Sequence, residues 1–570
     1  MPKPQPDSQL VEHLSSQLNI GDSLASLLVM RGIATFEEAR RFFRPQHSDL
    51  HDPFLMKDMD KAIERIEKAI AANERIMVYG DYDVDGTTSV AVVYSFFKKI
   101  YSNIEYYIPD RYKEGYGISE MGIDYAAESG ITLIIALDCG IKSCDKIEYA
   151  KQKGVEFIIC DHHLPGEILP DASAVLDPKR PDCEYPFKEL SGCGIGFKLC
   201  QAYSEKNNID IEELYEYLDL VAVSIASDLV KITDENRVLA YFGLQKIAEN
   251  PHSGLRALLE FYKPKEEYSI SDLVFSVGPR INAAGRVAHA QAAVQLLTET
   301  DIVKAREFAQ VLNQQNTERK EFDSNTTDEA LSMIEADSAF GTRFSNVLFN
   351  SSWHKGVIGI VASRLIEKYY KPTIILTESE GKVTGSARSV NGFDIHAAID
   401  ACGHLLLHYG GHNHAAGLSL LPENLPAFLN EFERIVKNTI DEHSLHPTID
   451  YDAEIDLTDI TGKFTRILKQ FSPFGPGNMN PVFLTRDLKV KDGMARVVGN
   501  NHLKLTVTDT DEIISFEAIA FDFGHFCKTL LDGPFDLCYT IEENTFNGKT
   551  TLQFNIKDIK PHAVNGFDGN

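Results

Sequence analysis

Three apolar runs, each ending in aspartate, constrain the fold of this chain more than any other feature. The runs are RIMVYGD (75–81), ITLIIALD (131–138) and VEFIICD (155–161), and helical periodicity lies between them at about 88–100, 119–130 and 143–154. A strand that is apolar throughout is buried on both faces, and strand–helix alternation produces a parallel sheet covered by helices. The sequence therefore predicts an α/β domain, with a further strand at 104–110.

Acidic and histidine side chains follow these strands at the point where each strand ends. They are Asp81, Asp83, Asp85, Asp138, Asp161, His162 and His163. The carboxyl ends of parallel strands meet at one edge of a sheet, so we expect these side chains to converge. Asp228, at the end of a helix predicted from 214 to 228, is a further candidate.

A convergence of carboxylates predicts a metal site, because like charges this close repel unless a cation or a proton lies between them. Carboxylate and imidazole ligands suit Mn²⁺, or Mg²⁺ with water in the remaining positions. Two ions about 3.5–4 Å apart stabilise the attacking and leaving oxygens of phosphoester hydrolysis. Taken singly, each residue has an ordinary explanation: Asp138, for example, could cap a helix. Acids at successive strand ends favour the metal site.

The rest of the chain divides by its patterning. We expect a helical extension, the α/β domain, a long helical connector, a second and smaller α/β domain, and a β-barrel of short alternating strands. A Pro- and Gly-rich segment at 472–481 precedes the barrel strands. The expected bounds are 1–50, 51–235, 236–340, 341–447 and 448–570.

Composition narrows the classes of function. The net charge of -28 argues against a nucleic-acid coat or a membrane-surface protein, but not against an enzyme with a local basic groove. The nine cysteines form no Cys-x-x-Cys pair, which indicates reduced thiols in the cytoplasm. The first residues lack the features of a signal peptide, and no apolar run reaches the roughly 18 residues of a membrane span.

Short motifs connect this pattern to a known family. DYDVDG (81–86), LDCG (137–140), DHH (161–163) and ASD (226–228) resemble, in order and spacing, the motifs of the DHH phosphoesterase superfamily. SWHKGVIGIVASRL (352–365), GSARS (385–389) and GGHNHAAG (410–417) resemble its DHH-associated C-terminal domain, and the tail resembles an OB-fold. The order of these parts, from about 50 to 560, is similar to that of the bacterial single-strand-specific 5′→3′ exonucleases of this superfamily.

The resemblance implies roles for the strand-end residues. Asp83, Asp85, Asp138, His162 and Asp228 would bind two Mn²⁺ or Mg²⁺ ions, with Asp138 as the bridge. Asp81 and His163 would ligate a metal, orient a ligand or contact phosphate, and those alternatives stay open. The nucleophile would be a water activated by the metals, so no side-chain nucleophile is required.

Substrate recognition is expected from basic and small residues outside the first domain as well as inside it. A terminal phosphate favours arginine and hydroxyl donors, which Ser386 and Arg388 supply. Further candidates for phosphate or DNA binding are Arg111, Tyr116, Arg280, Asn282, Gly411 and His412. Tyr112 and Tyr116 could stack on bases or belong to the core. A zinc site at His408, His412 and His414 has less support, because no cysteine or acid lies at ligand spacing.

The predicted barrel would grip single strands by stacking and phosphate contacts, or would be purely structural. Its candidates are Phe483, Arg486, Lys489, Arg496, His502 and Lys504.

The resulting prediction is a single-stranded-DNA-specific 5′→3′ exonuclease that releases 5′-mononucleotides and acts in DNA repair and recombination. Its substrate is single-stranded DNA with a 5′ end, and a single-strand-binding protein and a helicase are expected partners, with no membrane. The alternatives are an oligoribonuclease, a cyclic-dinucleotide phosphodiesterase, or a non-catalytic replication scaffold of the same superfamily.

Overall fold

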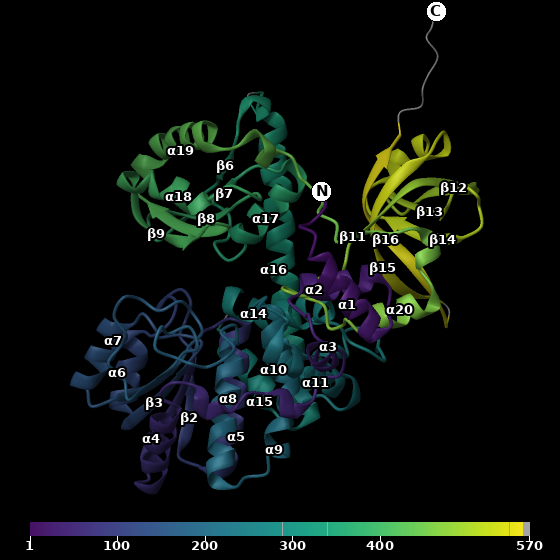
Figure 1. Ribbon diagram of the computed structural model, residues 1–570. Helices are drawn as coiled ribbons and strands as arrows, with labels where there is room; N and C mark the ends of the chain where they lie inside the picture. Colours follow the sequence, from purple (N-terminus) through teal and green to yellow (C-terminus); the bar gives the residue numbers. More distant parts are fainter. Residues whose placement is uncertain (288, 339, 547, 563–570) are drawn as a thin grey trace, which may run out of the picture.

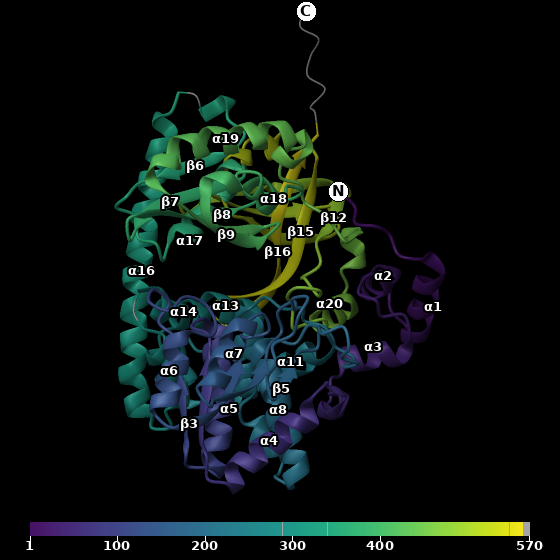
Figure 2. The same cartoon turned by 90° about the vertical axis from the view of Figure 1, so that its left-hand side faces the viewer.

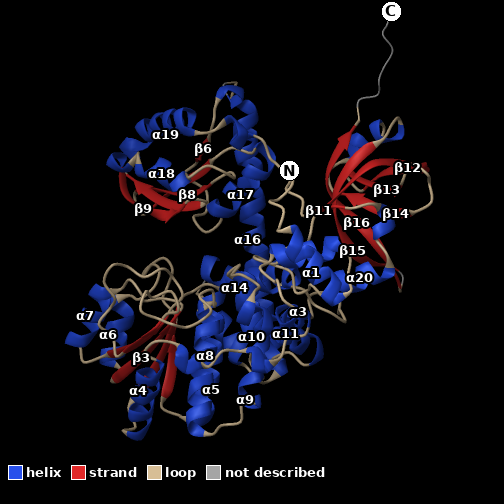
Figure 3. Cartoon of the chain, in the orientation of Figure 1, coloured by secondary structure: helices blue, strands red, loops and turns tan. Residues whose placement is uncertain are grey.

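The computed structural model describes residues 1–287, 289–338, 340–546 and 548–562. Its strands form three separate sheets (Figure 3). The first has the order β2-β1-β3-β4-β5, and every neighbouring pair is parallel. Its strands are β1 (Arg75–Gly80), β2 (Ile104–Tyr107), β3 (Ile131–Leu137), β4 (Glu156–Cys160) and β5 (Ala174–Leu176). The predicted parallel sheet is thus confirmed, with β5 as an additional short strand.

Helices cover both faces of this sheet because its strands are apolar on both sides. One face packs on α4 (Met59–Ala71), α5 (Val84–Ile100) and α8 (Gly192–Asn207), and the other on α6 (Glu120–Glu128) and α7 (Cys144–Gln152). Val78 belongs to the first core, whereas Met77 belongs to the second. Helix α5 begins earlier than the predicted residue 88, because the Asp83 carboxylate accepts from Gly86 N and caps it.

The region between the two α/β units is mostly part of the first core. Helices α10 (Leu218–Ser227), α11 (Asp234–Glu249), α12 (Ser253–Leu259), α13 (Ile270–Phe275), α14 (Val277–Val287) and α15 (Gln291–Thr298) all contribute to it, after the short α9 (Glu212–Tyr215). Among the described helices, only α16 (Ile302–Ala336), of 35 residues, continues from the first unit to the second (Figure 2). The segment expected as a connector, 236–340, therefore includes helices of the first core as well as α16. No described helix has both the length and the apolar character needed to cross a membrane.

The second unit is a mixed sheet in the order β6-β7-β8-β10-β9. It contains β6 (Asn346–Phe349), β7 (Thr373–Ser379), β8 (Lys382–Arg388), β9 (Leu406–His412) and β10 (Ala415–Leu420), with α17 (Ile358–Tyr369), α18 (Ile395–Asp400) and α19 (Leu425–Thr439). Only the β6–β7 pair is parallel. The hairpin of β9 and β10 places the GGHNHAAG motif on the side of this unit that faces the first unit (Figure 1).

The third sheet closes into the predicted barrel. Its order is β11-β12-β13-β14-β16-β15, and an additional pairing of β12 with β15 closes it. The elements are β11 (Ala453–Glu454), α20 (Gly462–Lys469), β12 (Phe483–Val498), β13 (His502–Thr508), β14 (Ser515–Ala520), β15 (Phe535–Phe546) and β16 (Lys549–Pro561).

The N-terminal helices pack on this barrel rather than on the sheet that follows them in sequence. They are α1 (Ser8–Leu18), α2 (Asp22–Met30) and α3 (Phe36–Phe43). Leu14 and Leu28 share a core with Phe483 and Tyr539 of the barrel. The Lys3 amide also donates to the Tyr451 carbonyl at 3.0 Å. The start of the chain is therefore joined to its last 120 residues or so.

A buried arginine fastens these parts to the first unit. Arg237 of α11 is 3% exposed, and its ring contact with Phe42 has a centroid distance of 3.8 Å. Burial, with Arg31 nearby, lowers its pKa to about 9. Its guanidinium donates to the carbonyls of Phe42, Gln470, Phe471, Ser472 and Pro473. One side chain thus connects α3, α11 and the segment after α20.

Candidate active site

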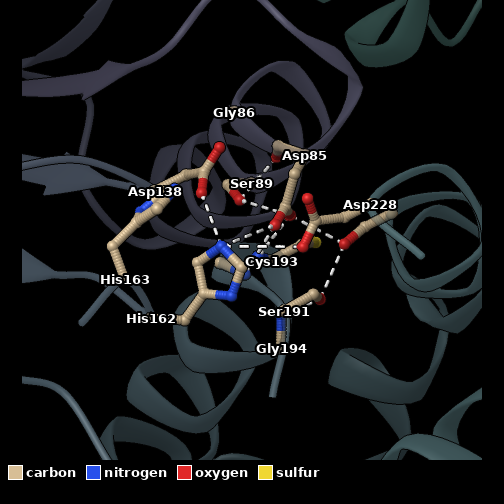
Figure 4. A network of polar contacts seen from close by, with 12 residues as sticks. Asp85, Gly86, Ser89, Asp138, His162, His163, Ser191, Cys193, Gly194 and Asp228 are labelled. Carbon is tan, nitrogen blue, oxygen red and sulfur yellow. Dashed lines mark hydrogen bonds and ion pairs between the residues drawn. The ribbon is translucent and has the colours of Figure 1, made fainter. Parts of the chain in front are cut away.

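His162 lies at the centre of the predicted convergence of strand ends. Its Nε2 is 3.2 Å from Asp138 Oδ1, 3.6 Å from Asp228 Oδ2 and 3.7 Å from Asp85 Oδ2 (Figure 4). Two sets of potential metal ligands share this imidazole, each with its ligand atoms within 4.8 Å: Asp85 with Asp228, and Asp138 with His163. The fold therefore brings together side chains from β3, β4, α5 and α10.

Asp85 is held in place before any ligand binds. Its carboxylate accepts from Gly192 N at 2.7 Å, Cys193 N at 2.8 Å and Ser224 Oγ at 2.7 Å. Helix α8 begins here, and it approaches Asp138 so closely that a Cβ on Gly192 would lie 2.6 Å from the Asp138 Cβ. Gly192 and Ser224 were not among the residues predicted from the sequence, because the segment SGCGIG marks a helix start but not what the helix contacts.

Asp138 itself has an unusual backbone conformation. Its φ is 60°, in the left-handed region that few non-glycine residues adopt. Its amide donates to Cys160 O at 2.8 Å, which ties the turn to the end of β4. Such strain is maintained only where the surroundings fix it, and it is frequent at functional sites.

Asp161 belongs to neither ligand set in the described residues, and it positions the second histidine. Its Oδ1 is 2.7 Å from His163 Nδ1, and its Oδ2 accepts from Ile141 N at 2.9 Å. Burial acts to raise the pKa of Asp161, but the bond to His163 and the backbone donors hold it below its usual value. His163 Nε2 is in turn 3.1 Å from the Tyr116 hydroxyl. Tyr116 is 57% exposed, so it does not belong to the core.

The first two aspartates of the DYDVDG motif lie beside the centre. Asp83 caps α5, and Asp81 is fully buried with Oδ1 accepting from Gly117 N at 3.3 Å. Burial, and then the charge of Asp83, raises the pKa of Asp81 to about 8. Neither residue belongs to the two ligand sets around His162 in the described part of the chain.

The residues at this centre suit divalent cations. Asp81 Oδ2 and Asp138 Oδ1 are buried and accept no hydrogen bond from the described residues. Burial and neighbouring carboxylates, Asp85 first among them, raise the pKa of Asp138, and the same causes raise that of Asp228 to about 8. Crowded carboxylates with an imidazole among them provide the hard donors that Mn²⁺ and Mg²⁺ prefer.

Ser386 and Arg388 form a second polar site on β8. Arg388 Nη1 donates to Ser386 Oγ at 3.2 Å and to Ala387 O at 2.8 Å. In the first turn of α17, a Cβ on Gly359 would lie 2.8 Å from Ser386 Oγ and 3.1 Å from Arg388 Nη2. The N-terminus of α17 thus lies against both side chains, and a helix N-terminus beside arginine is suited to phosphate.

An arginine cluster, made of Arg111, Arg286, Arg319 and Arg388, connects this site to the first unit. Burial lowers the pKa of Arg286 to about 10, and the other three add repulsion. Arg111 lies over the Tyr82 ring, with its guanidinium carbon 5.0 Å from the centroid. Its positive charge acts to lower the pKa of Asp81, against the effect of burial. An anionic ligand would relieve the repulsion within this cluster. Arg280 and Asn282, which lie close to Arg286 in the sequence, were predicted as phosphate-binding residues, but Arg286 was not.

Arg280 and Asn282, the two residues predicted from the segment that contains Arg286, have different surroundings. Arg280 is 7% exposed and donates to Asn313 Oδ1 at 3.0 Å and to Ser276 O at 2.8 Å, so it holds α14 in place and is not brought to the centre. Asn282 lines a cavity of about 190 Å³ together with Ser227 and Arg286.

The GGHNHAAG segment forms an exposed edge strand and turn. Gly411 has φ 149°, and a Cβ there would lie 2.3 Å from Ala415 O, so the hairpin requires glycine. His412 is exposed on β9. None of the three histidines belongs to a ligand set in the described residues, and the zinc alternative gains no support.

Few of the predicted barrel contacts have a free side chain. Phe483 is fully buried and belongs to the barrel core. Arg486 pairs with Glu454, and Lys504 with Glu517. His502 contacts the ring of Phe521, which is 52% exposed. Lys489 and Arg496 lie on β12, the latter opposite Lys504 of β13.

Comparison with known proteins matches each unit to a family. The matching models are the DHH family, N-terminal domain (75–225), the DHHA1 domain (342–438) and the RecJ OB domain (451–558). The chain is 37% identical over 569 residues to the single-stranded-DNA-specific exonuclease RecJ of Bacillus subtilis (strain 168), covering 99% of this chain and 71% of that protein. The chain belongs to the RecJ family.

Other RecJ proteins extend the match. That of Haemophilus influenzae is 32% identical over 528 residues, which are 90% of this chain and 92% of the relative. The crystal structure of RecJ with Mn²⁺ from Thermus thermophilus matches with a TM-score of 0.83 and 26% identity, over 98% of this chain and 79% of that one. RecJ with Mg²⁺ from the same organism gives 0.76 and 25%, over 97% and 77%. The recognition of the DHH superfamily and of the fold class is therefore confirmed.

Proposed function

We propose that this chain is a metal-dependent exonuclease that digests single-stranded DNA from its 5′ end and releases 5′-mononucleotides. The observation that carries the proposal is the combination of two sites: a carboxylate–histidine centre around His162, and an arginine cluster that reaches Arg388 in the second unit. The RecJ relatives are named as single-stranded-DNA-specific exonucleases, and RecJ of Thermus thermophilus has been solved with Mn²⁺ and with Mg²⁺. DNA repair and recombination are the processes that this activity serves.

We assign the metal ligands as Asp83, Asp85, Asp138, His162 and Asp228, with Asp81 beside them. When bound, two Mn²⁺ or Mg²⁺ ions supply Lewis acidity, which favours ionisation of the attacking water and offsets charge on the phosphate. The chain contributes preorganisation: the donors from α8 and Ser224 fix Asp85, and Asp161 fixes His163. In this proposal His163, Tyr116 and His412 contact the scissile phosphate.

The end of the strand is recognised by the second unit in this proposal. Arg388, Ser386 and the N-terminus of α17 bind the terminal phosphate, and Arg111 and Arg286 complete its surroundings. A strand bound in this way presents its first phosphodiester to the metal centre, so the product is a mononucleotide. The barrel adds affinity for longer strands through exposed groups such as Phe521.

We further propose that the chain divides into five parts, with boundaries at 50, 235, 340 and 447. We also propose that the protein is cytoplasmic, and that a single-strand-binding protein and a helicase supply its single-stranded substrate. The nine cysteines are free, as a reducing compartment would keep them.

A cleavage assay with Mn²⁺ tests the function directly. We expect early release of a 5′ label as mononucleotide from single-stranded DNA, late release of a 3′ label, and no digestion of blunt duplex. Arg388→Met should reduce the preference for 5′-phosphorylated ends. Early release of the 3′ label would reverse the polarity, and activity confined to short RNA would favour the oligoribonuclease alternative.

A further inference from the structure

A cavity of about 600 Å³ lies where α16, the loop after β2 and the second unit meet. Figure 2 shows α16 running beside both units. Four aromatic side chains line the cavity: Tyr112, Phe322, Trp353 and His354. This volume is within the range of small-ligand sites, about 300–1,000 Å³. The exonuclease centre around His162 uses none of these residues.

An aromatic stack forms one wall. The rings of Phe322 and His354 are 5.0 Å apart and nearly parallel, at 11°. Phe322 remains 43% exposed, so its ring is partly open to the cavity. The Gly356 amide donates to His354 Nδ1 at 3.0 Å, which favours the neutral imidazole with its proton on Nε2. A planar ring that stacks on this pair gains favourable contact, and any nucleobase can do so because every base has a π-face.

Polar groups complete the cavity. Lys355 Nζ lies 5.8 Å from the centroid of the Tyr112 ring and makes no ion pair with any residue that the structure describes. The Trp353 indole donates to Glu329 at 2.8 Å, which holds that carboxylate at the wall. Glu378, at the end of β7, is exposed and also lines the cavity. The aromatic surface suits a base, the unpaired ammonium suits a phosphate, and the Glu329 carboxylate can accept from an amino group of the base.

The cavity also shares a wall with the arginine cluster. The Tyr112 hydroxyl donates to Arg286 O, and Arg286 Nη1 donates to Gly356 O at 3.1 Å. Tyr112 and Gly356 therefore separate the cavity from the arginine cluster, and a small anion that leaves the cluster is close to the cavity.

We infer that the cavity is a separate binding site for a nucleoside 5′-monophosphate, with the base on Phe322 and the phosphate on Lys355. The inference rests on the proposed function, because that class of molecule is what the proposed exonuclease releases. Occupancy places the product beside the two hydrogen bonds that hold Arg286, so the site is positioned to respond to accumulated product.

The chain contains its own reporter for this test. Trp353 is the one tryptophan of the sequence, and it lines the cavity. The full-length protein, in EDTA to prevent hydrolysis, is titrated with each of the four deoxynucleoside 5′-monophosphates while its tryptophan fluorescence is recorded, with correction against free tryptophan. We expect a saturable change with the mononucleotides and none with inorganic phosphate, which would fill the arginine cluster only.

Variants separate the cavity from the arginine cluster. Phe322→Leu and Lys355→Gln should each weaken the mononucleotide response by on the order of tenfold, as expected for loss of one stacking or phosphate contact. Both should retain wild-type melting temperature and strand hydrolysis. Arg388→Met should leave the response unchanged.

Two outcomes would overturn the inference. If Arg388→Met abolished the response while Phe322→Leu preserved it, the nucleotide would be binding at the arginine cluster. If a 5′-phosphorylated oligonucleotide changed the fluorescence and mononucleotides did not, the cavity would belong to the path of the strand. Absence of any response with normal strand digestion would reject this site alone, whereas a response without any digestion would reject the proposed function alone.

Discussion

Replacing Arg237 by methionine should separate the barrel from the first unit without unfolding that unit. Methionine keeps most of the buried volume but removes all five hydrogen bonds that the guanidinium donates to backbone carbonyls. Net hydrogen bonds are worth about 1 kcal/mol each, and more from a charged donor, while the variant recovers the cost of burying the charge. We therefore expect a loss of about 3–5 kcal/mol.

The loss should be local, because the acceptors belong to α3 and to residues 470–473 whereas Arg237 belongs to α11. Hydrogen exchange would show reduced protection in α1–α3 and in the barrel, with β1 and β3 unchanged. Urea unfolding would show an added early transition. Arg434→Met is a matched control, since Arg434 is 61% exposed and its pair with Glu431 is a surface pair. If the unfolding free energy of Arg237→Met equalled that of the control, the carbonyl contacts would not be what joins these parts.

Three further changes test other parts of the structure. Gly192→Ala should lower the turnover of single-stranded DNA by about 100-fold with little change in melting temperature, because its Cβ would displace Asp138, and normal turnover would contradict the close approach. Asp177, fully buried at the end of β5, has its pKa raised to about 7 by burial. A raised carboxyl pKa contributes stability below about pH 4, and this contribution is lost as pH rises through 7. Asp177→Asn has no such loss, so its free energy of unfolding should exceed that of wild type by a margin that grows from pH 5 to pH 8 and reaches up to about 4 kcal/mol, measured by melting curves. Deleting 451–570 together with 1–45 should leave a protein that hydrolyses short strands but binds long ones weakly, whereas deleting 451–570 alone should aggregate, as light scattering would show.

Local patterning predicted the sheet and its metal centre because both depend on neighbours in sequence. An apolar strand and the aspartate that follows it are adjacent in the chain, so their positions at one sheet edge follow once the sheet is parallel. His162 and Asp138 come together for this reason. The same reasoning found the α/β nature of the second unit and the barrel.

Local patterning did not predict contacts between segments that are distant in the sequence. Nothing near Gly192 in the sequence indicates that α8 approaches Asp138. No periodicity separates Arg286, which joins the arginine cluster, from Arg280, which bonds α14 to Asn313 of α16. Phe483 looked like a stacking residue because alternation along a strand does not reveal which face is inside. The helical character of the first residues was apparent, but not that they pack on the barrel.

The junction between the first helices and the barrel has a consequence for how the polypeptide is made. The apolar faces of α1–α3, including Leu14 and Leu28, leave the ribosome first, but the barrel that covers them begins only after residue 450. At about 5–20 residues per second, that wait lasts on the order of 20–80 s. During this time the nascent chain exposes a surface suited to a chaperone, and the final fold forms only when its last part arrives.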